Sequence, residues 1–158
     1  MTWDWSRLGG HPAGLWLIKH VISPLDRGVV RVTRGRLPLP TSLIFPTLLL
    51  TSRGRRTGLE RAVPLIYVRD GSSYVVANAR PEGERKNPWM LNLAAADDAL
   101  IVVKKSRIRV QVQLLDETEA EQLWPRIIAI WPALDRFYRK TGDRWVFRLE
   151  PMDGMELG

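Results

Sequence analysis

Apolar and polar residues alternate along much of the chain after residue 46, which is the pattern of β-strands. Between residues 107 and 114, for example, Val110 and Val112 alternate with Arg109 and Gln111, as in a strand with one buried and one wet face. Glycine-containing segments separate several of these runs and favour hairpin turns. The predicted strands cover residues 48–52, 61–68, 73–78, 100–104, 107–114 and 145–149.

The N-terminal part instead shows helical spacing. From Leu25 to Val32 apolar residues recur at i, i+4 and i+7, and arginines recur at the same spacing on another face. Gly35 is typical of the end of such a helix. We therefore predict a helical extension over residues 1–36 that includes a basic amphipathic helix, followed by the main domain over residues 37–158.

Two segments within the main domain carry helix signals. The Asn-Pro pair at 87–88 predicts the start of a short helix that ends near residue 96. Asp116 lies three residues before Glu119, as in a capping box, and Pro125 and Pro132 are expected to break the following region into short pieces. Six strands with a few short helices indicate an α+β domain, a small antiparallel barrel that its last strand closes after the helices.

Composition excludes several kinds of site. The chain has no cysteine and only two histidines, His11 and His20, so disulfides, thiolate catalysis and a histidine-rich metal site are not expected. No apolar run approaches the roughly 20 residues that cross a bilayer, and residues 1–22 lack the layout of a cleaved signal. A cytoplasmic location is the resulting expectation.

The net charge of +7 is concentrated at one end of the sequence. Residues 1–61 hold ten Lys and Arg against three Asp and Glu, whereas the remaining residues hold fourteen of each. This asymmetry indicates an anionic partner, either a nucleic acid, a membrane surface or a polyanionic cofactor. Nucleic acid is not expected, because the sequence shows no helix-turn-helix, zinc-finger or RNA-recognition motif.

Four arginines cluster at the first predicted hairpin turn. Arg53, Arg55, Arg56 and Arg61 fall within nine residues, together with Thr57 and two glycines. Guanidinium groups bind phosphate and carboxylate bidentately, and a glycine-containing turn exposes backbone N–H groups beside them. The cluster therefore indicates either an anion-binding site or a solvated basic turn.

A second segment is a candidate wall for a binding pocket. The predicted helix that follows residue 87 places Trp89 and Leu93 on one face, with Asn92 beside them. The alternative is a structural helix that packs Trp89 into the core and turns Asn92 outward. Pro64 lies inside a predicted strand, where it removes a hydrogen-bond donor and indicates an edge or a bulge.

Taken in order, these motifs resemble the deazaflavin-dependent nitroreductase family, a group of split β-barrel oxidoreductases that use coenzyme F-420. The resemblance runs from about Ser23 to Pro151. It is carried by Leu49-Leu50-Thr51-Ser52-Arg53-Gly54-Arg55-Arg56-Thr57-Gly58 with Arg61 and Pro64, then Asp70-Gly71, Val76-Ala77-Asn78, Asn87-Pro88-Trp89 and Asn92-Leu93.

The resemblance implies a site for the coenzyme and a chemistry. The arginine turn would grip the phosphate and oligoglutamate tail, and the reduced deazaflavin would deliver hydride by itself, so no catalytic triad is needed. The implied tail-binding residues are Arg55, Arg56, Thr57 and Arg61; those lining the deazaflavin ring are Val63, Pro64, Leu65, Val76, Ala77, Asn78, Ala79, Trp89, Met90 and Asn92.

The acceptor end of the site is less defined. Where nitroreductases of the family carry tyrosines over the substrate, this chain has Trp131, Leu134 and Phe137, and Tyr138 is the one nearby candidate proton donor. The resemblance implies reduction of a small organic acceptor such as a quinone, an enone or a nitro compound. The alternative is a non-catalytic protein that holds the deazaflavin or FMN.

Two further partners are consistent with the sequence. Trp3, Trp5 and Trp16 lie near the basic helix, which would suit a peripheral position on the inner face of the plasma membrane. The alternative is that these tryptophans pack on the barrel and the arginines are solvated. Split barrels of this family often pair, so a homodimer is also an expectation.

Overall fold

The computed structural model describes the backbone of residues 45–157 and the side chains of residues 45–152. The predicted extension over residues 1–36 lies outside the described residues, so its helices and the division of the chain at residue 36 stay predictions.

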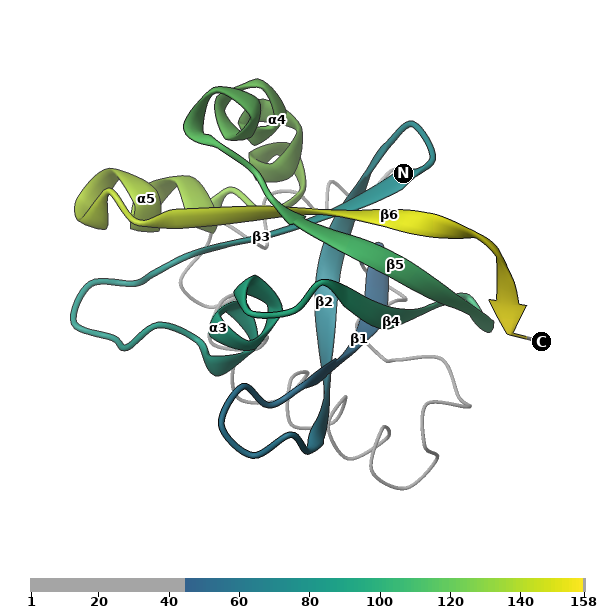
Figure 1. Ribbon diagram of the computed structural model, residues 1–158. Coiled ribbons are helices and arrows are strands. Elements are labelled where there is room, and N and C mark those ends of the chain that lie inside the picture. Colours follow the sequence, from purple (N-terminus) through teal and green to yellow (C-terminus); the bar gives the residue numbers. More distant parts are fainter. Residues whose placement is uncertain (1–44, 158) are drawn as a thin grey trace.

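Six strands form a closed antiparallel barrel in the order β1-β2-β3-β6-β5-β4 (Figure 1). The last strand, which follows the helices in the sequence, inserts between the third and the fifth strands and closes the sheet, as predicted. The split-barrel α+β class is therefore confirmed. The strands are β1 (Thr47–Arg53), β2 (Glu60–Asp70), β3 (Ser73–Ala79), β4 (Asp98–Val103), β5 (Ser106–Leu114) and β6 (Arg144–Leu157).

The prediction for the last strand was too short. It ended at Leu149, whereas β6 continues to Leu157. Pro151 lies within it and pairs with Val110 of β5, next to a register shift between Ile108 and Val110. A proline cannot donate to a strand ladder, and an irregular register allows it to remain in the sheet.

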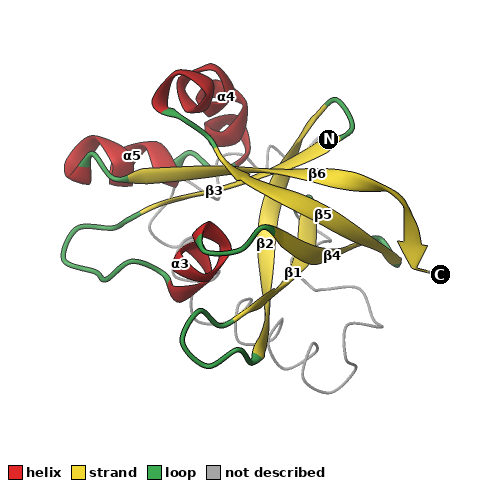
Figure 2. Cartoon of the chain, in the orientation of Figure 1, coloured by secondary structure: helices red, strands yellow, loops and turns green. Residues whose placement is uncertain are grey.

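Three helices accompany the barrel: α3 (Pro88–Ala94), α4 (Glu117–Ile130) and α5 (Ala133–Thr141) (Figure 2). The predicted cap of α4 is confirmed, because the Asp116 carboxylate accepts a hydrogen bond of 2.8 Å from the Glu119 N–H. The predicted break at Pro125 was wrong. Pro125 lies inside α4 on its exposed face, so the carbonyl that loses its backbone N–H donor faces solvent. The neighbouring Trp124 is buried and holds the helix against the sheet. Pro132 does separate α4 from α5.

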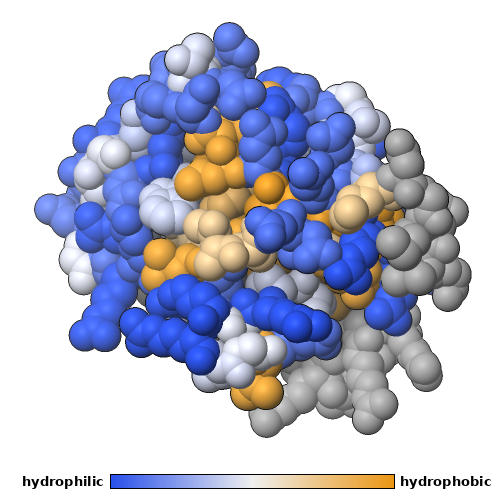
Figure 3. Space-filling model, in the orientation of Figure 1, coloured by the Kyte–Doolittle hydropathy of each residue, from blue (hydrophilic) through white to orange (hydrophobic). Residues whose placement is uncertain are grey.

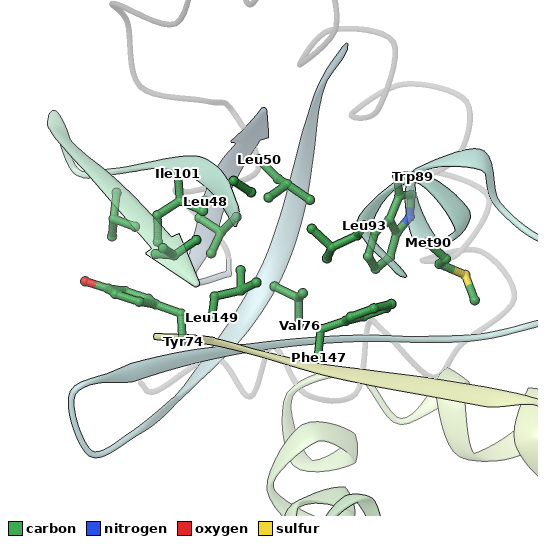
Figure 4. Close-up of a cluster of buried hydrophobic side chains, with 13 residues drawn as sticks. Leu48, Leu50, Tyr74, Val76, Trp89, Met90, Leu93, Ile101, Phe147 and Leu149 are labelled. Carbon is green, nitrogen blue, oxygen red and sulfur yellow. The ribbon is translucent and has the colours of Figure 1, made fainter. Parts of the chain in front are cut away.

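The barrel interior holds the main core, and α3 closes one end of it (Figure 4). Trp89, Met90 and Leu93 of α3 belong to this cluster, and the Trp89 ring lies 6.0 Å from that of Phe147. Burial of three apolar side chains fixes a helix of seven residues that would be unstable alone. The other buried members of the interior core cluster are Leu48, Leu50, Tyr74, Val76, Ala99, Ile101, Val103, Val110, Phe147 and Leu149.

A second core lies on the outer face of the sheet, beneath α4 and α5. Apolar residues of α4 pack there against Val68, Val75, Ala79 and Val146. Ion pairs surround this contact: the nearly inaccessible Arg144 of β6 bonds to the carboxylates of Glu117 and Glu121, and its guanidinium stacks on the Trp124 and Tyr138 rings. The two helices are therefore attached to β2, β3 and β6 by packing and by charge.

β2 and β3 separate partway along their length. They pair only from Tyr67 to Asp70 on β2, opposite Ser73–Val76 on β3. Residues 60–66 of β2 pair with β1 alone, and residues 77–79 of β3 pair with β6 alone, among the described strands. Backbone N–H and C=O groups along these two edges therefore lack a described strand partner, which makes this divergence the split of the barrel.

Candidate functional site

The arginine turn between β1 and β2 has a defined backbone shape. The Gly54 N–H donates to the Leu59 carbonyl at 2.8 Å, and the Gly58 N–H donates to the Gly54 carbonyl at 2.8 Å. Gly58 has a φ of 69°, a conformation that glycine adopts without strain. A Cβ atom at Gly54 would lie 2.8 Å from the Thr57 hydroxyl oxygen. Thr57 and both glycines therefore shape the turn that presents the arginines.

The four arginines of this turn make no ion pair within the described part of the chain. Arg53, Arg55, Arg56 and Arg61 are all exposed, and the one carboxylate in the same stretch belongs to Glu60, opposite Arg53 in the β1–β2 register. Unpaired like charges on a hairpin repel one another, and an anion that lies among them relieves this repulsion. The turn therefore provides a cationic surface for an anionic group.

A contact between distant segments joins the turn to α3. The Asn92 side-chain oxygen accepts two hydrogen bonds from Arg55, one from the backbone N–H at 3.2 Å and one from the guanidinium Nη1 at 3.1 Å. Asn92 is 8% exposed, so it faces inward. The alternative in which Asn92 turns outward is not supported. Figure 1 shows the turn beside α3, at the end of the barrel that this helix closes.

The β2 and β3 residues expected around the ring lie at the split of the barrel, on both faces of the sheet, whereas Trp89, Met90 and Asn92 lie on α3. Val63 and Leu65 pack against the interior core, so Pro64 between them faces outward from an edge, as predicted. On β3, Val76 belongs to the interior core and Ala79 to the outer one.

Several of these side chains are too buried to contact a ligand in this conformation. Val76, Ala79, Met90 and Trp89 are at most 7% exposed. Their contribution to a ring site would come from backbone groups and from the shape of the core. Asn78 is more accessible, and its amide donates to the Met90 sulfur at 3.2 Å, which connects β3 to α3.

The segment from Trp131 to Thr141 extends from Phe45, just before β1, to the end of β3. At its start, the Trp131 ring lies 6.0 Å from that of Phe45, which just precedes β1. At its end, the Thr141 hydroxyl donates to the Arg80 carbonyl, immediately after β3. Leu134 and Phe137 pack against the outer core from this segment. The three residues expected near the acceptor therefore lie on one segment, residues 131–141, which we call the covering segment because it packs on the outer core.

Trp131 and Tyr138 differ in their hydrogen bonding. The indole N–H of Trp131 is buried and has no acceptor among the described residues. The Tyr138 hydroxyl instead donates to Glu117 at 3.2 Å, and its ring stacks under the Arg144 guanidinium at 4.1 Å. Burial raises the pKa of Tyr138 above its ordinary value. In this conformation the candidate proton donor therefore takes part in the ion-pair cluster that holds α4.

A pocket of about 320 Å³ lies on the other side of Arg55, between the end of β1, the end of α3 and the start of β4. Arg53, Arg55 and Asn92 belong both to this pocket and to the candidate residues selected from the sequence. The loop after α3 contributes residues 95–97, and the remaining lining residues, apart from Asn92 of α3, come from the strands and from the arginine turn. The lining residues are Thr51, Ser52, Arg53, Gly54, Arg55, Glu60, Asn92, Ala95, Ala96, Asp97, Asp98, Ala99, Leu100 and Arg109.

Two other features, a metal site and a membrane-crossing helix, are absent from the described residues. Within residues 45–152 no group of three or more His, Asp or Glu side chains is arranged to hold a metal ion. None of the helices that the structure describes is long and apolar enough to cross a membrane. Figure 3 shows an apolar band over β5, β6 and α3 on one face, bordered by hydrophilic residues.

Comparison with known proteins gives consistent matches. The family model for F420H(2)-dependent quinone reductases matches residues 28–148. An F420H(2)-dependent quinone reductase of Mycobacterium tuberculosis is 30% identical over 114 residues, which cover 69% of this chain and 76% of that protein.

Solved structures share the fold. An F420-H2 dependent reductase, FDR-A, superposes with a TM-score of 0.60 at 22% identity, covering 66% of this chain and 94% of that one. A structure described as a domain-swapped dimer superposes with a TM-score of 0.61 at 20% identity, covering 78% of this chain and 95% of that one.

Proposed function

Because the chain belongs to the F420H(2)-dependent quinone reductase family, we propose that it binds the reduced deazaflavin coenzyme and transfers hydride from it to a quinone. The observation that carries this proposal is the arginine turn, with four exposed guanidinium groups, no described ion-pair partner and a rigid attachment to α3.

The turn fits the anionic end of this coenzyme. A phosphate and an oligoglutamate tail carry several negative charges, and Arg55, Arg56 and Arg61 supply bidentate donors on one exposed surface. Thr57 shapes the backbone that carries them. Repulsion among the arginines destabilises the free turn, and their attraction to the anionic tail therefore stabilises the complex.

The split of the barrel is the proposed place of the ring. The edges of β2 around Pro64 and of β3 around Ala77 offer backbone groups that a planar heterocycle with carbonyl oxygens can use. When bound, the reduced coenzyme supplies the hydride. The part of the protein is to hold the ring against these edges and to orient the acceptor.

The covering segment is the proposed wall on the acceptor side. Leu134 and Phe137 provide apolar surface there, and the Trp131 indole N–H has no acceptor among the described residues. Because this N–H is buried, it can donate to a carbonyl oxygen of the quinone only if the segment moves to expose it. A buried donor without an acceptor is costly, so a bound carbonyl in this position would recover that free energy. Tyr138 can act as a proton donor only if its bond to Glu117 opens.

Fluorescence titration with the oxidised coenzyme tests the tail site. The Arg55→Ala/Arg56→Ala variant is expected to raise the Kd by about a hundredfold, because two charge-assisted contacts of about 1.5 kcal/mol each are lost. A matched control, Lys104→Ala/Arg107→Ala, removes two exposed charges from the β4–β5 hairpin. Equal Kd values for the wild type and the turn variant would refute the tail site.

Turnover separates catalysis from simple binding. The wild type is expected to oxidise the reduced coenzyme faster with a benzoquinone or menaquinone analogue than the mixture without protein. If the protein binds the coenzyme and leaves this rate unchanged, it is a coenzyme-binding protein without quinone reductase activity.

We also propose a peripheral membrane position and pairing of two chains. The basic helix predicted between Leu25 and Val32 and the tryptophans near it in the sequence suit an anionic bilayer surface. Vesicles with anionic lipid should sediment the full chain and leave a chain without residues 1–36 in solution.

Pairing is supported by the dimeric structural neighbour and by the apolar band in Figure 3. A monomeric mass in analytical ultracentrifugation would exclude it.

A further inference from the structure

We infer that Asn92 is a positioning residue, which holds Arg55 ready for the anionic tail and makes no contact with the ring. The inference rests on the proposed function, since it assigns a role within the proposed tail site. It also revises the ring-lining role that the family resemblance implied for Asn92.

The geometry of the contact carries the inference. One side-chain oxygen of Asn92 accepts from both the backbone N–H and the guanidinium Nη1 of Arg55, at 3.2 and 3.1 Å. The first bond fixes the backbone of the turn, and the second fixes the direction of the side chain. A single acceptor thereby determines where the Arg55 charge lies. An amide oxygen has two acceptor sites, so this oxygen is fully used.

Asn92 is less accessible than Arg55, and the pocket that it lines lies on the other side of Arg55 from the split. Asn92 is 8% exposed, whereas Arg55 is exposed. The guanidinium has five N–H donors, and one nitrogen contacts Asn92, so donors on the other nitrogens remain for a phosphate or a carboxylate. Asn92 therefore acts on the coenzyme through Arg55.

The core makes this support rigid. Leu93 follows Asn92 directly and is fully buried in the barrel, with Trp89 and Met90 one turn earlier. Asn92 consequently has little freedom to move, and Arg55 is held in place before any ligand arrives. Preorganisation of this kind lowers the ordering cost of binding, and here it favours the charged tail specifically.

The test compares two ligands. One is coenzyme F420, and the other is its chromophore without phosphate and glutamate tail. Fluorescence titration gives a Kd for each, and their ratio measures recognition of the tail. Asn92→Leu removes the acceptor at similar volume and is expected to weaken binding of the full coenzyme about tenfold, while binding of the tail-free chromophore stays unchanged.

A double-mutant cycle identifies the route of the effect. Arg55→Ala is expected to weaken binding of the full coenzyme at least as much as Asn92→Leu, and the combined variant should be no weaker than Arg55→Ala alone. Gln122→Leu is the matched control, because Gln122 is an exposed amide of α4 that lies outside the proposed site. It should leave the ratio of the two Kd values unchanged.

Each alternative outcome is distinct. If Asn92→Leu weakens both ligands equally, or if its effect adds to that of Arg55→Ala, Asn92 contacts the ring and the inference is wrong. Thermal unfolding shows whether the Leu variant is folded, and Asn92→Ala replaces it if it is not. If the wild type binds neither ligand, the proposed function itself fails. If it binds the coenzyme and Arg55→Ala has no effect, only the positioning role is overturned.

Discussion

The attachment of α3 to the barrel makes a prediction about the arginine turn. Leu93 is fully buried in the interior core, and α3 has only seven residues and no side-chain bond at its N-cap, Asn87. Such a helix is too short to be stable without tertiary packing. Replacing Leu93 with alanine should therefore loosen α3, and with it the Asn92 contact that holds Arg55.

The expected magnitude follows from burial. Leu93→Ala removes roughly three methylene equivalents from a site with 0% exposure, which is worth about 2.4 kcal/mol of transfer free energy. The cavity that remains adds to this loss, so the variant should be about 3 to 4 kcal/mol less stable. This is a large part of the stability of a domain of this size, so the measurements are best made at low temperature.

Urea unfolding measures the global loss, and amide hydrogen exchange of Arg55 measures the local one. The Arg55 N–H is bonded to Asn92 at 3.2 Å, so its exchange should accelerate when α3 opens. Leu123→Ala is the matched control, because Leu123 is equally a buried leucine, but belongs to α4 and the outer core. If Arg55 exchanges equally in both variants after correction for global stability, α3 does not support the turn.

Three further predictions concern the turn, the tyrosines and the covering segment. Gly54→Ala should lower Tm by about 3 °C, because its Cβ would lie 2.8 Å from the Thr57 hydroxyl, and Gly54→Ala/Thr57→Ala should recover part of this loss. Burial raises the pKa of Tyr67 and Tyr138 above 10.0, so their contribution to stability is complete below that pH and is lost as the pH rises further. In the double Phe variant the denaturation midpoint should therefore change less between pH 9 and pH 11 than in the wild type, with absorbance at 295 nm following tyrosine ionisation. Trp131→Phe should slow quinone reduction roughly two- to tenfold and leave the coenzyme Kd unchanged, whereas a changed Kd at an unchanged rate would contradict the acceptor-side role.

Local patterns were sufficient to predict the strands and the order in which the barrel closes. Alternating apolar residues and glycine-containing turns predict every strand end within two residues, except the C-terminal end of β6. The two errors have a common cause. Pro125 and Pro151 are breakers by local rules, yet tertiary packing of Trp124 in one case and a register shift beside Val110 in the other keeps the element intact.

The candidate site was predictable in its charges and not in its contacts. Four arginines in one turn are visible in the sequence, and the structure leaves them exposed and without a described ion pair. The contact between Arg55 and Asn92 joins residues 37 positions apart, and it depends on how α3 docks into the barrel. The same docking buries Met90 and Val76, which sequence motifs alone could not show.

The central claim is that the arginine turn binds the anionic tail while the ring lies at the split between β2 and β3. A crystal structure of the complex with the oxidised coenzyme tests this most directly. We expect the phosphate or a tail carboxylate within hydrogen-bond distance of Arg55 and Arg56, with the ring beside Pro64 and Ala77. A tail bound away from the turn, or a ring bound elsewhere on the barrel, would contradict it.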